Sequence, residues 1–249
     1  NTLVIANQKG GVGKTTTSVN LAASLAATKH RILLIDLDPQ GSATVGCGVN
    51  KQILTASINE VLLGEASVQE ATHRTAWSFD ILPSNGELTV AEVRLLKHDQ
   101  REQCLKDALS EVRSQYDFII IDCPPSLNML TVNALVAADS VIVPIQCEYY
   151  ALEGVSKLNA SIGLVQRYLN PGLKIEGVLL TLYDDRLQLC RRVAEEARNY
   201  FGEKVYETII RRNISLAEAP GFGQPIALYD PDSRGTFNYN SLASEICAG

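Results

Sequence analysis

Short runs of apolar, mostly β-branched residues recur along the chain and predict buried β-strands. They lie at Leu3–Ala6, Ile32–Ile35, Phe118–Ile121, Val141–Ile145 and Val178–Leu180. None of them shows the polar alternation of a strand with one face in water, so we expect both faces of each strand to be covered. Such runs are typical of a parallel sheet inside an α/β protein.

Between these strands the hydrophobic pattern changes to the period of a helix. Four apolar residues after Lys14 fall on one helix face: Val19, Ala22, Ala23 and Ala26. Residues 88–113 and 188–200 predict helices with charged outer faces. Strands that alternate with helices favour an α/β fold, with a mostly parallel, doubly wound sheet flanked by helices in a single domain over residues 1–249.

Composition narrows the class of protein without naming a function. With 46% hydrophobic and 20% charged residues, the 249-residue chain is typical of a globular protein and not of a disordered one. A net charge of −6 argues against a surface that is basic all over, although it allows a local basic patch. The six cysteines are scattered and form no C-x-x-C pair, which disfavours zinc ribbons and thioredoxin chemistry. We therefore expect reduced thiols and a cytoplasmic location.

A glycine-rich segment between the first predicted strand and the first predicted helix is the strongest chemical signal. It consists of Lys9, Gly10, Gly11, Val12, Gly13, Lys14, Thr15 and Thr16. Its glycines allow backbone N–H groups to point at phosphate oxygens beside a helix N-terminus. Lys14 would neutralise the β- and γ-phosphates, and the Thr15 hydroxyl would bind Mg²⁺. The alternative, a plain glycine turn before a helix, accounts poorly for the Lys-Thr-Thr that follows.

Two of the predicted strands end in carboxylates. Asp36 and Asp38 end the strand at 32–35, and Asp122 ends the strand at 118–121. Asp36 and Asp38 would face the same way in an extended segment, and ligands in such folds bind beyond the carboxyl ends of strands. The second strand has the pattern of a Walker B strand, whose Asp122 would hold Mg²⁺ through water. Each aspartate could instead cap a turn, but two such strands beside a phosphate loop favour a metal and water site at Thr15, Asp38 and Asp122.

The phosphate loop departs from the standard spacing, since Gln8 stands where a glycine is usual and a second lysine, Lys9, follows it. This pattern resembles the deviant Walker A motif of the ParA/MinD ATPases, which are P-loop NTPases. The resemblance implies ATP hydrolysis with Mg²⁺ in a nucleotide-sandwich homodimer. In such a dimer Lys9 reaches the phosphates held by the facing subunit, Lys14 binds those of its own subunit, and Asp38 positions the attacking water.

Further segments resemble those of ParA-type partition ATPases. Because of them, the chain is similar to the chromosomal members of that family, the Soj type. The matching segments are 36–41, 122–127, 144–154, 176–181, 216–220 and 229–235. Ser42 replaces the usual asparagine of the Soj type, and the match is weakest across 45–110. The resemblance implies a role in chromosome or plasmid segregation, a nucleoid-associated location and a ParB-like activator protein.

Base recognition rests on a segment late in the chain. No Asn-Lys-x-Asp motif supports a guanine-specific GTPase. In the family, a Pro-Arg-Asn stretch lies near the adenine, and here the corresponding residues are Arg211, Arg212 and Asn213, with Arg211 in place of the proline. Asn213 offers a donor and an acceptor to a purine edge, but it could equally cap a helix or turn.

The resemblance also implies DNA binding without sequence preference by the ATP-bound dimer. Residues 186–212 hold seven basic and four acidic side chains, a local charge of +3. Arg186 occupies one family DNA-binding position, whereas Ser215 occupies the other and carries no charge. Arg191 and Arg192 are the candidates to compensate for it. A solvated helix face explains the same charges and stays a serious alternative.

Two other functions compete with the partition ATPase. A MinD-like, membrane-associated regulator of division-site placement would carry a basic amphipathic C-terminal helix. Residues 240–249 contain one acidic and no basic residue, so we expect no membrane partner. An iron–sulfur carrier would need paired cysteines, and Cys123 is a single candidate.

Overall fold

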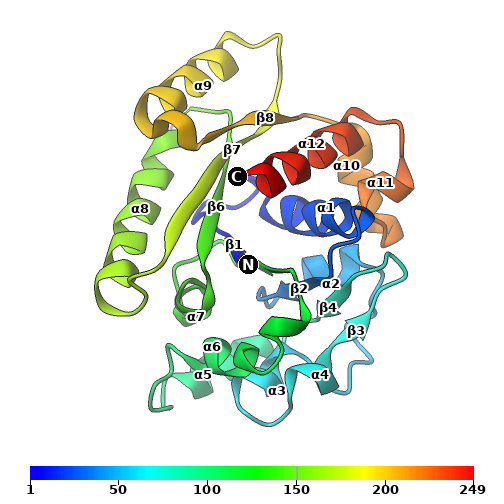
Figure 1. Ribbon diagram of the computed structural model, residues 1–249, viewed down its shortest axis with the longest axis vertical. Helices are drawn as coiled ribbons and strands as arrows, with labels where there is room; N and C mark the ends of the chain where they lie inside the picture. The colour runs from blue at the N-terminus through cyan, green and yellow to red at the C-terminus, as the bar shows by residue number, and fades with distance from the viewer. Residues whose placement is uncertain (150) are drawn as a thin grey trace.

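The computed structural model describes residues 1–149 and 151–249, without the side chains of 152–154. Its centre is one sheet with the strand order β3-β4-β2-β5-β1-β6-β7-β8 (Figure 1). The strands are β1 (Thr2–Ile5), β2 (Ile32–Asp36), β3 (His73–Arg74), β4 (Asp80–Leu82), β5 (Phe118–Asp122), β6 (Ser140–Gln146), β7 (Lys174–Tyr183) and β8 (Val205–Arg211). Each of the five predicted strands is present, so the predicted sheet is confirmed.

The strands pair in parallel throughout the sheet except where β3 meets β4. In the central register, Asp122 of β5 lies beside Ile5 of β1 and beside Asp36 of β2. The carboxyl ends of the three central strands therefore meet at one edge of the sheet, where a ligand site is expected.

Helices cover both faces of the sheet. Leu3 and Ile5 pack on the face covered by α1 (Lys14–Ala27), α2 (Ser42–Gly46), α10 (Ile214–Glu218), α11 (Ile226–Tyr229) and α12 (Arg234–Ala248). Val4 packs on the opposite face, which is covered by α3 (Ile58–Leu62), α4 (Val68–Ala71), α5 (Leu88–Leu95), α6 (Cys104–Ser110), α7 (Met129–Ala137), α8 (Ala151–Tyr168) and α9 (Gln188–Phe201). Successive residues of a strand point to opposite faces, so this arrangement explains the uninterrupted apolar runs. The doubly wound fold is confirmed.

Three short 3-10 helices complete the described elements: η1 (Arg113–Gln115), η2 (Gly202–Lys204) and η3 (Ala219–Phe222). The predicted helix at 88–113 is wrong as a single element. The chain forms α5, turns through 96–103, and then forms α6 and η1. Gln100 has a φ of 60°, a left-handed conformation that interrupts a right-handed helix.

The sequence patterns did not predict three strands. β3 and β4 have two and three residues, too few to show a period. β8 is the edge strand next to β7, and its exposed Glu207 and half-buried Thr208 break the apolar run. The hydrophobic pattern is therefore weakest at the two margins of the sheet.

The C-terminal helix α12 packs directly on the phosphate-loop helix α1 (Figure 1). Tyr239 of α12 is buried, and its hydroxyl lies 3.1 Å from the hydroxyl of Thr17. Leu242, Ala243 and Ile246 place the apolar face of α12 in the same core. Within the described part of the chain, no helix is both long and apolar enough to span a bilayer.

Truncation of the α12 core should destabilise the protein strongly. Leu242 is fully buried, so Leu242→Ala should cost about 2–5 kcal/mol in the free energy of unfolding through lost burial and a cavity. Phe237 lies on the same helix but is mostly exposed, so Phe237→Ala should change that free energy by less than about 0.5 kcal/mol. Urea unfolding of both variants checks this, and equal costs would contradict the docked helix.

Candidate nucleotide-binding site

The loop between β1 and α1 has a backbone that only glycine adopts easily. Gly11 has a φ of 76° and Gly13 a φ of 85°, both in the left-handed region. Gly13 is also the N-cap of α1, so the free N–H groups of the first helical turn open onto the loop. A helix N-terminus with this geometry attracts anions, as the sequence predicts.

Lys14 lies under the loop and not in solvent. Its side chain is buried, and its Nζ donates a hydrogen bond to the carbonyl oxygen of Lys9 at 2.8 Å. Burial lowers the pKa of this ammonium, while the nearby charges of Asp122 and Asp38 act in the opposite direction. The cation is thus held in the centre of the loop, where a phosphate group could replace the Lys9 carbonyl as its partner.

Asp122 joins the end of β5 to the first turns of α1. Its two carboxylate oxygens accept hydrogen bonds from the hydroxyls of Thr15, at 2.7 Å, and Ser18, at 2.8 Å. Burial raises the pKa of the Asp122 carboxyl, and the neighbouring Asp36 adds to this effect. Hydroxyl and carboxylate oxygens side by side are the donors that Mg²⁺ prefers, so Thr15 and Asp122 fit this ion. Ser18 was not predicted, although its position one helical turn after Thr15 could have indicated it.

Asp36 and Asp38 have different environments. β2 ends at Asp36, so the alternation that led us to expect both carboxylates on one side does not extend to Asp38. Asp36 is fully buried and accepts hydrogen bonds from the backbone and hydroxyl of Thr44, at 2.8 and 2.7 Å. Asp38 is half-buried, and its carboxylate accepts a bond from the backbone of Gln40 at 2.9 Å. Asp36 therefore has a structural role, and Asp38 is the carboxylate that a ligand can reach.

Lys9 forms an ion pair with Glu148, which follows β6. The Lys9 side chain is 41% exposed, so the pair lies at the rim of the loop and not beneath it. Tyr150, in the neighbouring segment 144–154 that supports the family resemblance, lies outside the described residues. The two lysines of the motif thus differ, one buried against the loop and one at the surface held by a carboxylate.

A small cavity of about 110 Å³ lies beside the phosphate loop. Its lining includes Gly13, Thr16, Thr181, Arg211, Asn213 and Tyr239. The side chain of Asn213 accepts a hydrogen bond from the backbone of Leu216 at 3.2 Å and caps α10, so the structure shows the capping role that the sequence left open. Arg211 donates a bond to Asp185 at 2.9 Å. The cavity adjoins the phosphate loop, and the side-chain oxygen of Asn213 at its wall already accepts the capping bond.

A larger cavity, about 530 Å³, lies elsewhere. It is lined by residues near the amino ends of β2, β4 and β5, among them His30, Arg31, Asp80 and Tyr116. We favour the smaller cavity as part of the site, because it adjoins the loop, the buried lysine and the strand ends. Size alone does not identify the chemistry.

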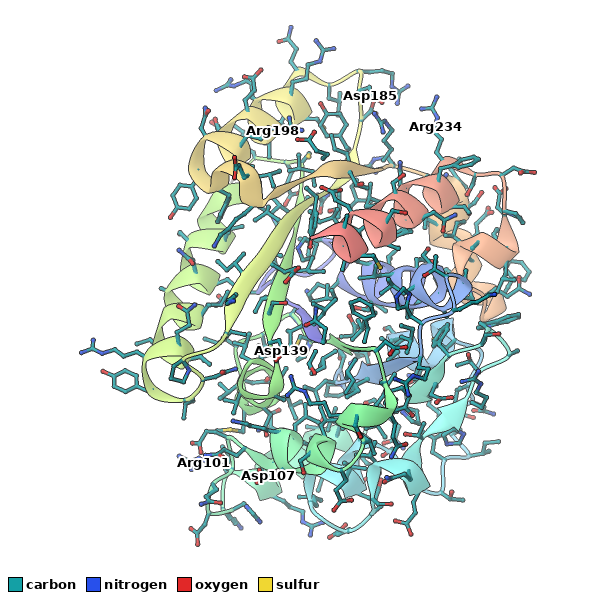
Figure 2. The ribbon with its side chains drawn as sticks, viewed as in Figure 1. Arg101, Asp107, Asp139, Asp185, Arg198 and Arg234 are labelled. Atoms are coloured by element: carbon teal, nitrogen blue, oxygen red, sulfur yellow. The ribbon has the colours of Figure 1, made fainter. Side chains whose placement is uncertain are left out.

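The basic region, residues 186–212, carries less net positive charge in the fold than a count along that segment indicates. Arg186 donates two side-chain hydrogen bonds to Asp184, at 2.9 and 2.7 Å, and Arg191 donates one to the carbonyl of Asp185 at 3.1 Å. With these two aspartates included, residues 184–212 hold seven basic and six acidic side chains, a net charge of +1. Figure 2 shows Asp185 and Arg198 at the end of the molecule that carries α9. Of the predicted DNA contacts, Arg186 and Arg191 are already engaged within the chain.

Two other predicted positions have structural partners as well. Ser215, which replaces a basic residue of the family, donates a hydrogen bond to Asp230 at 2.6 Å. Cys123 is fully buried, and burial raises the pKa of its thiol, which opposes a thiolate ligand. Among the side chains that the structure describes, no three of histidine, cysteine or acidic type gather into a metal site.

Comparison with known proteins agrees with this geometry. A family model described as an AAA domain matches residues 1–175. The chain is 52% identical to the chromosome partitioning protein ParA of Myxococcus xanthus, over 98% of this chain and 87% of that protein. It is also 52% identical to the sporulation initiation inhibitor protein Soj of Bacillus subtilis, over 99% of this chain and 98% of that protein.

A solved structure is similar over almost the same length. The crystal structure of cobyrinic acid a,c-diamide synthase from Mycobacterium smegmatis, with bound ADP and magnesium, superposes with a TM-score of 0.87 at 40% identity. The match covers 98% of this chain and 92% of that one. A protein with the same fold is therefore known with ADP and magnesium bound to it.

Removal of the buried cation should abolish triphosphate binding. Lys14→Ala deletes the only charge that the buried part of the loop offers to phosphate, so calorimetric titration with ATP should show at least a hundredfold weaker binding, about 2.7 kcal/mol. Lys106→Ala, on the exposed side of α6, serves as the control and should bind normally. Unchanged affinity in Lys14→Ala would contradict the phosphate-loop assignment.

Proposed function

The chain belongs to the ParA/Soj family of chromosome-partitioning ATPases, and from this premise we propose that residues 1–249 act as one domain that hydrolyses ATP at the loop Lys9–Thr16. The observation that carries the proposal is the convergence of three groups. Lys14 lies inside a left-handed glycine loop, Thr15 contacts Asp122, and Asp38 lies at the same edge of the sheet.

Different residues of the site bind the phosphates, the metal ion and the base. The N–H groups from Gly10 to Thr16 hold the phosphates at the N-terminus of α1, and Lys14 neutralises their charge. Thr15 and Asp122 would hold Mg²⁺, with the carboxylate of Asp38 as the third candidate near them. When bound, this ion offsets the negative charge on the phosphate oxygens. Thr16, Arg211 and Asn213 line the cavity that receives the base.

Asp38 positions the attacking water. Its charge acts on both Lys14 and Asp122, so it lies within electrostatic reach of the phosphate and metal groups. Unlike Asp36, it is half-buried and can contact a water molecule at the site. Such a contact matters more in the transition state than in the ground state, so its loss affects turnover before binding.

Lys9 acts across a homodimer. At the rim of the loop, its ammonium pairs with Glu148, whereas the ammonium of Lys14 donates to the backbone carbonyl of Lys9. In a sandwich of two subunits, the phosphate of the facing subunit would replace Glu148 as its partner. Exchange of one anion for another keeps the lysine charge paired in both states, which makes the exchange inexpensive.

Replacement of Asp38 should separate binding from hydrolysis. In Asp38→Ala we expect ATP affinity within about threefold of the parent and turnover at least ~100-fold lower, because only water positioning is lost. ATP should then trap this variant as a dimer in light scattering, and Lys9→Ala added to it should restore the monomer. Normal phosphate release by Asp38→Ala would contradict the role given to this residue.

DNA binding by the ATP-bound dimer is the next step of the proposed cycle. Family membership supports it, together with Arg186, Arg191 and Arg192 on the surface around α9. The pairing of Arg186 with Asp184 means that a DNA phosphate must displace a carboxylate, so each subunit binds weakly and two subunits are needed. In this cycle a ParB-like protein stimulates hydrolysis, and the dimer resides on the nucleoid.

The alternative of a membrane-associated regulator is less well supported. The described C-terminal helix α12 uses its apolar face to pack against α1, and that face is therefore not free for lipid. Liposome pelleting with ATP beside a DNA mobility shift separates the two functions.

Charge changes around Arg186 should alter DNA affinity in opposite directions. Arg186→Ala with Arg191→Ala and Arg192→Ala should weaken ATP-dependent binding about tenfold, with no dependence on sequence and a smaller salt effect. Asp184→Asn frees Arg186 from its partner and should strengthen binding several-fold. Mobility shifts at two salt concentrations measure both. If neither change alters the affinity, the region is a solvated face.

A further inference from the structure

We propose that Ser84 and Thr44 are positioning residues for Asp38, joined to it by a buried hydrogen-bond chain that fixes the backbone of the loop 38–41. The inference rests on the proposed role of Asp38 as the residue that orients the attacking water. Among the described residues, the side-chain hydrogen bonds of Ser84 and Thr44 go to Asp36, Asp38 and Asn85 and not to the phosphate loop, so we expect their effect on hydrolysis to pass through the Asp38 loop.

The chain begins at the end of β2. Thr44 Oγ1 donates to Asp36 Oδ2 at 2.7 Å and accepts a bond from the Ser84 N–H at 2.9 Å. The Ser84 hydroxyl then donates to the carbonyl oxygen of Asp38 at 2.8 Å. Asp36, Thr44 and Ser84 are all fully buried, so water cannot replace these bonds.

The chain closes on the backbone of Asp38 from its other side. The Asp38 N–H donates to Asp36 Oδ1 at 3.1 Å. Both backbone polar groups of Asp38 are thus held by side chains that start from strand ends, Asp36 on β2 and Ser84 two residues after β4. β2 and β4 pair in parallel, so their ends lie side by side. The sheet itself fixes the position from which the Asp38 carboxylate extends.

The packing of the loop gives a second, independent observation. Gly41 has a φ of 65°, and a Cβ at this position would lie 2.9 Å from the Ser84 carbonyl oxygen. On its other side the same Cβ would lie 2.9 Å from Cδ of Lys51, whose ammonium donates to the carbonyl of Gln40 at 2.5 Å. The loop is therefore in close contact with Ser84 at two points, its hydroxyl and its carbonyl.

This arrangement fixes the backbone of Asp38 but leaves its carboxylate able to accept a further hydrogen bond. Its Oδ1 accepts the bond from Gln40, and among the described residues no side chain donates to the carboxylate. The backbone is held while one oxygen is left for a ligand or water. Catalysis is sensitive to such placement, because a displacement of about 1 Å can cost on the order of a hundredfold in rate.

The test compares hydroxyl deletion with hydroxyl conservation. Ser84→Ala removes the bond to Asp38, Thr44→Val removes two bonds at nearly constant volume, and Thr44→Ser keeps both of them. We expect Ser84→Ala and Thr44→Val to lower kcat for ATP hydrolysis roughly tenfold, with KM for ATP changed less than about twofold. Thr44→Ser should return kcat to near the parent value.

A matched control removes a buried hydroxyl with no such link. Ser140, at the start of β6, is buried, and its Oγ has no hydrogen-bond partner among the described residues. Ser140→Ala should leave both kcat and KM unchanged. Thermal unfolding of each variant shows which ones are folded at the assay temperature. Of the two hydroxyl deletions in the chain, Ser84→Ala is expected to lose less stability than Thr44→Val, because Asp38 O keeps its bond from the Gly41 N–H.

The outcomes separate this inference from the proposed function. Normal turnover in Asp38→Ala would overturn the role of Asp38 itself and the positioning role with it. If Asp38→Ala stops turnover while folded Ser84→Ala keeps kcat within twofold, the positioning role alone is overturned. It is also overturned if KM rises in proportion as kcat falls, or if Thr44→Ser is as impaired as Thr44→Val.

Discussion

Two buried carboxylates constrain the rest of the site. Asp36 and Asp122 lie in register on neighbouring strands, both without solvent exposure, and burial raises the pKa of each. Buried carboxylates are costly unless donors surround them, and the donors here come from α1 and α2. Thr15 and Ser18 bind Asp122, and Thr44 binds Asp36. The helix that carries the phosphate loop is thereby fixed to the centre of the sheet by polar bonds as well as by apolar packing.

The sequence could predict the centre of this arrangement because its signals are local. Apolar runs of three to five residues identify strands covered on both faces, and the lysines and glycines of the loop lie within six positions of one another. The strands at one margin of the sheet were not predicted, because β3 and β4 are too short to show a hydrophobic pattern. The break between α5 and α6 was not predicted either, because no single residue type indicates the left-handed turn at Gln100. A periodic apolar pattern records burial and not the continuity of a helix.

The hydroxyl groups that support the site were not predicted from the sequence for another reason. Ser84 lies 46 residues from Asp38, so their pairing depends on strand order, which sequence spacing does not reveal. Ser18 differs, because its position one helical turn after Thr15 could have indicated it. The net charge of the basic region also depends on contacts that the sequence count left out. The count over residues 186–212 took Arg186 as a free cation, whereas Asp184, two residues before it, neutralises it in the fold. The sequence count therefore overestimated the positive charge of this surface.

The contact between Thr17 and Tyr239 also bears on biosynthesis. The two residues are 222 positions apart, and the hydrophobic core beneath the phosphate-loop helix is completed by the last helix of the described chain. Contacts of such separation form late, and a chain emerging from the ribosome makes its N-terminal elements first. The ATP-binding loop is translated long before α12, but it acquires its full support only after α12 has left the exit tunnel. A nascent chain of this protein consequently needs α12 before its phosphate loop has the packing seen in the folded structure.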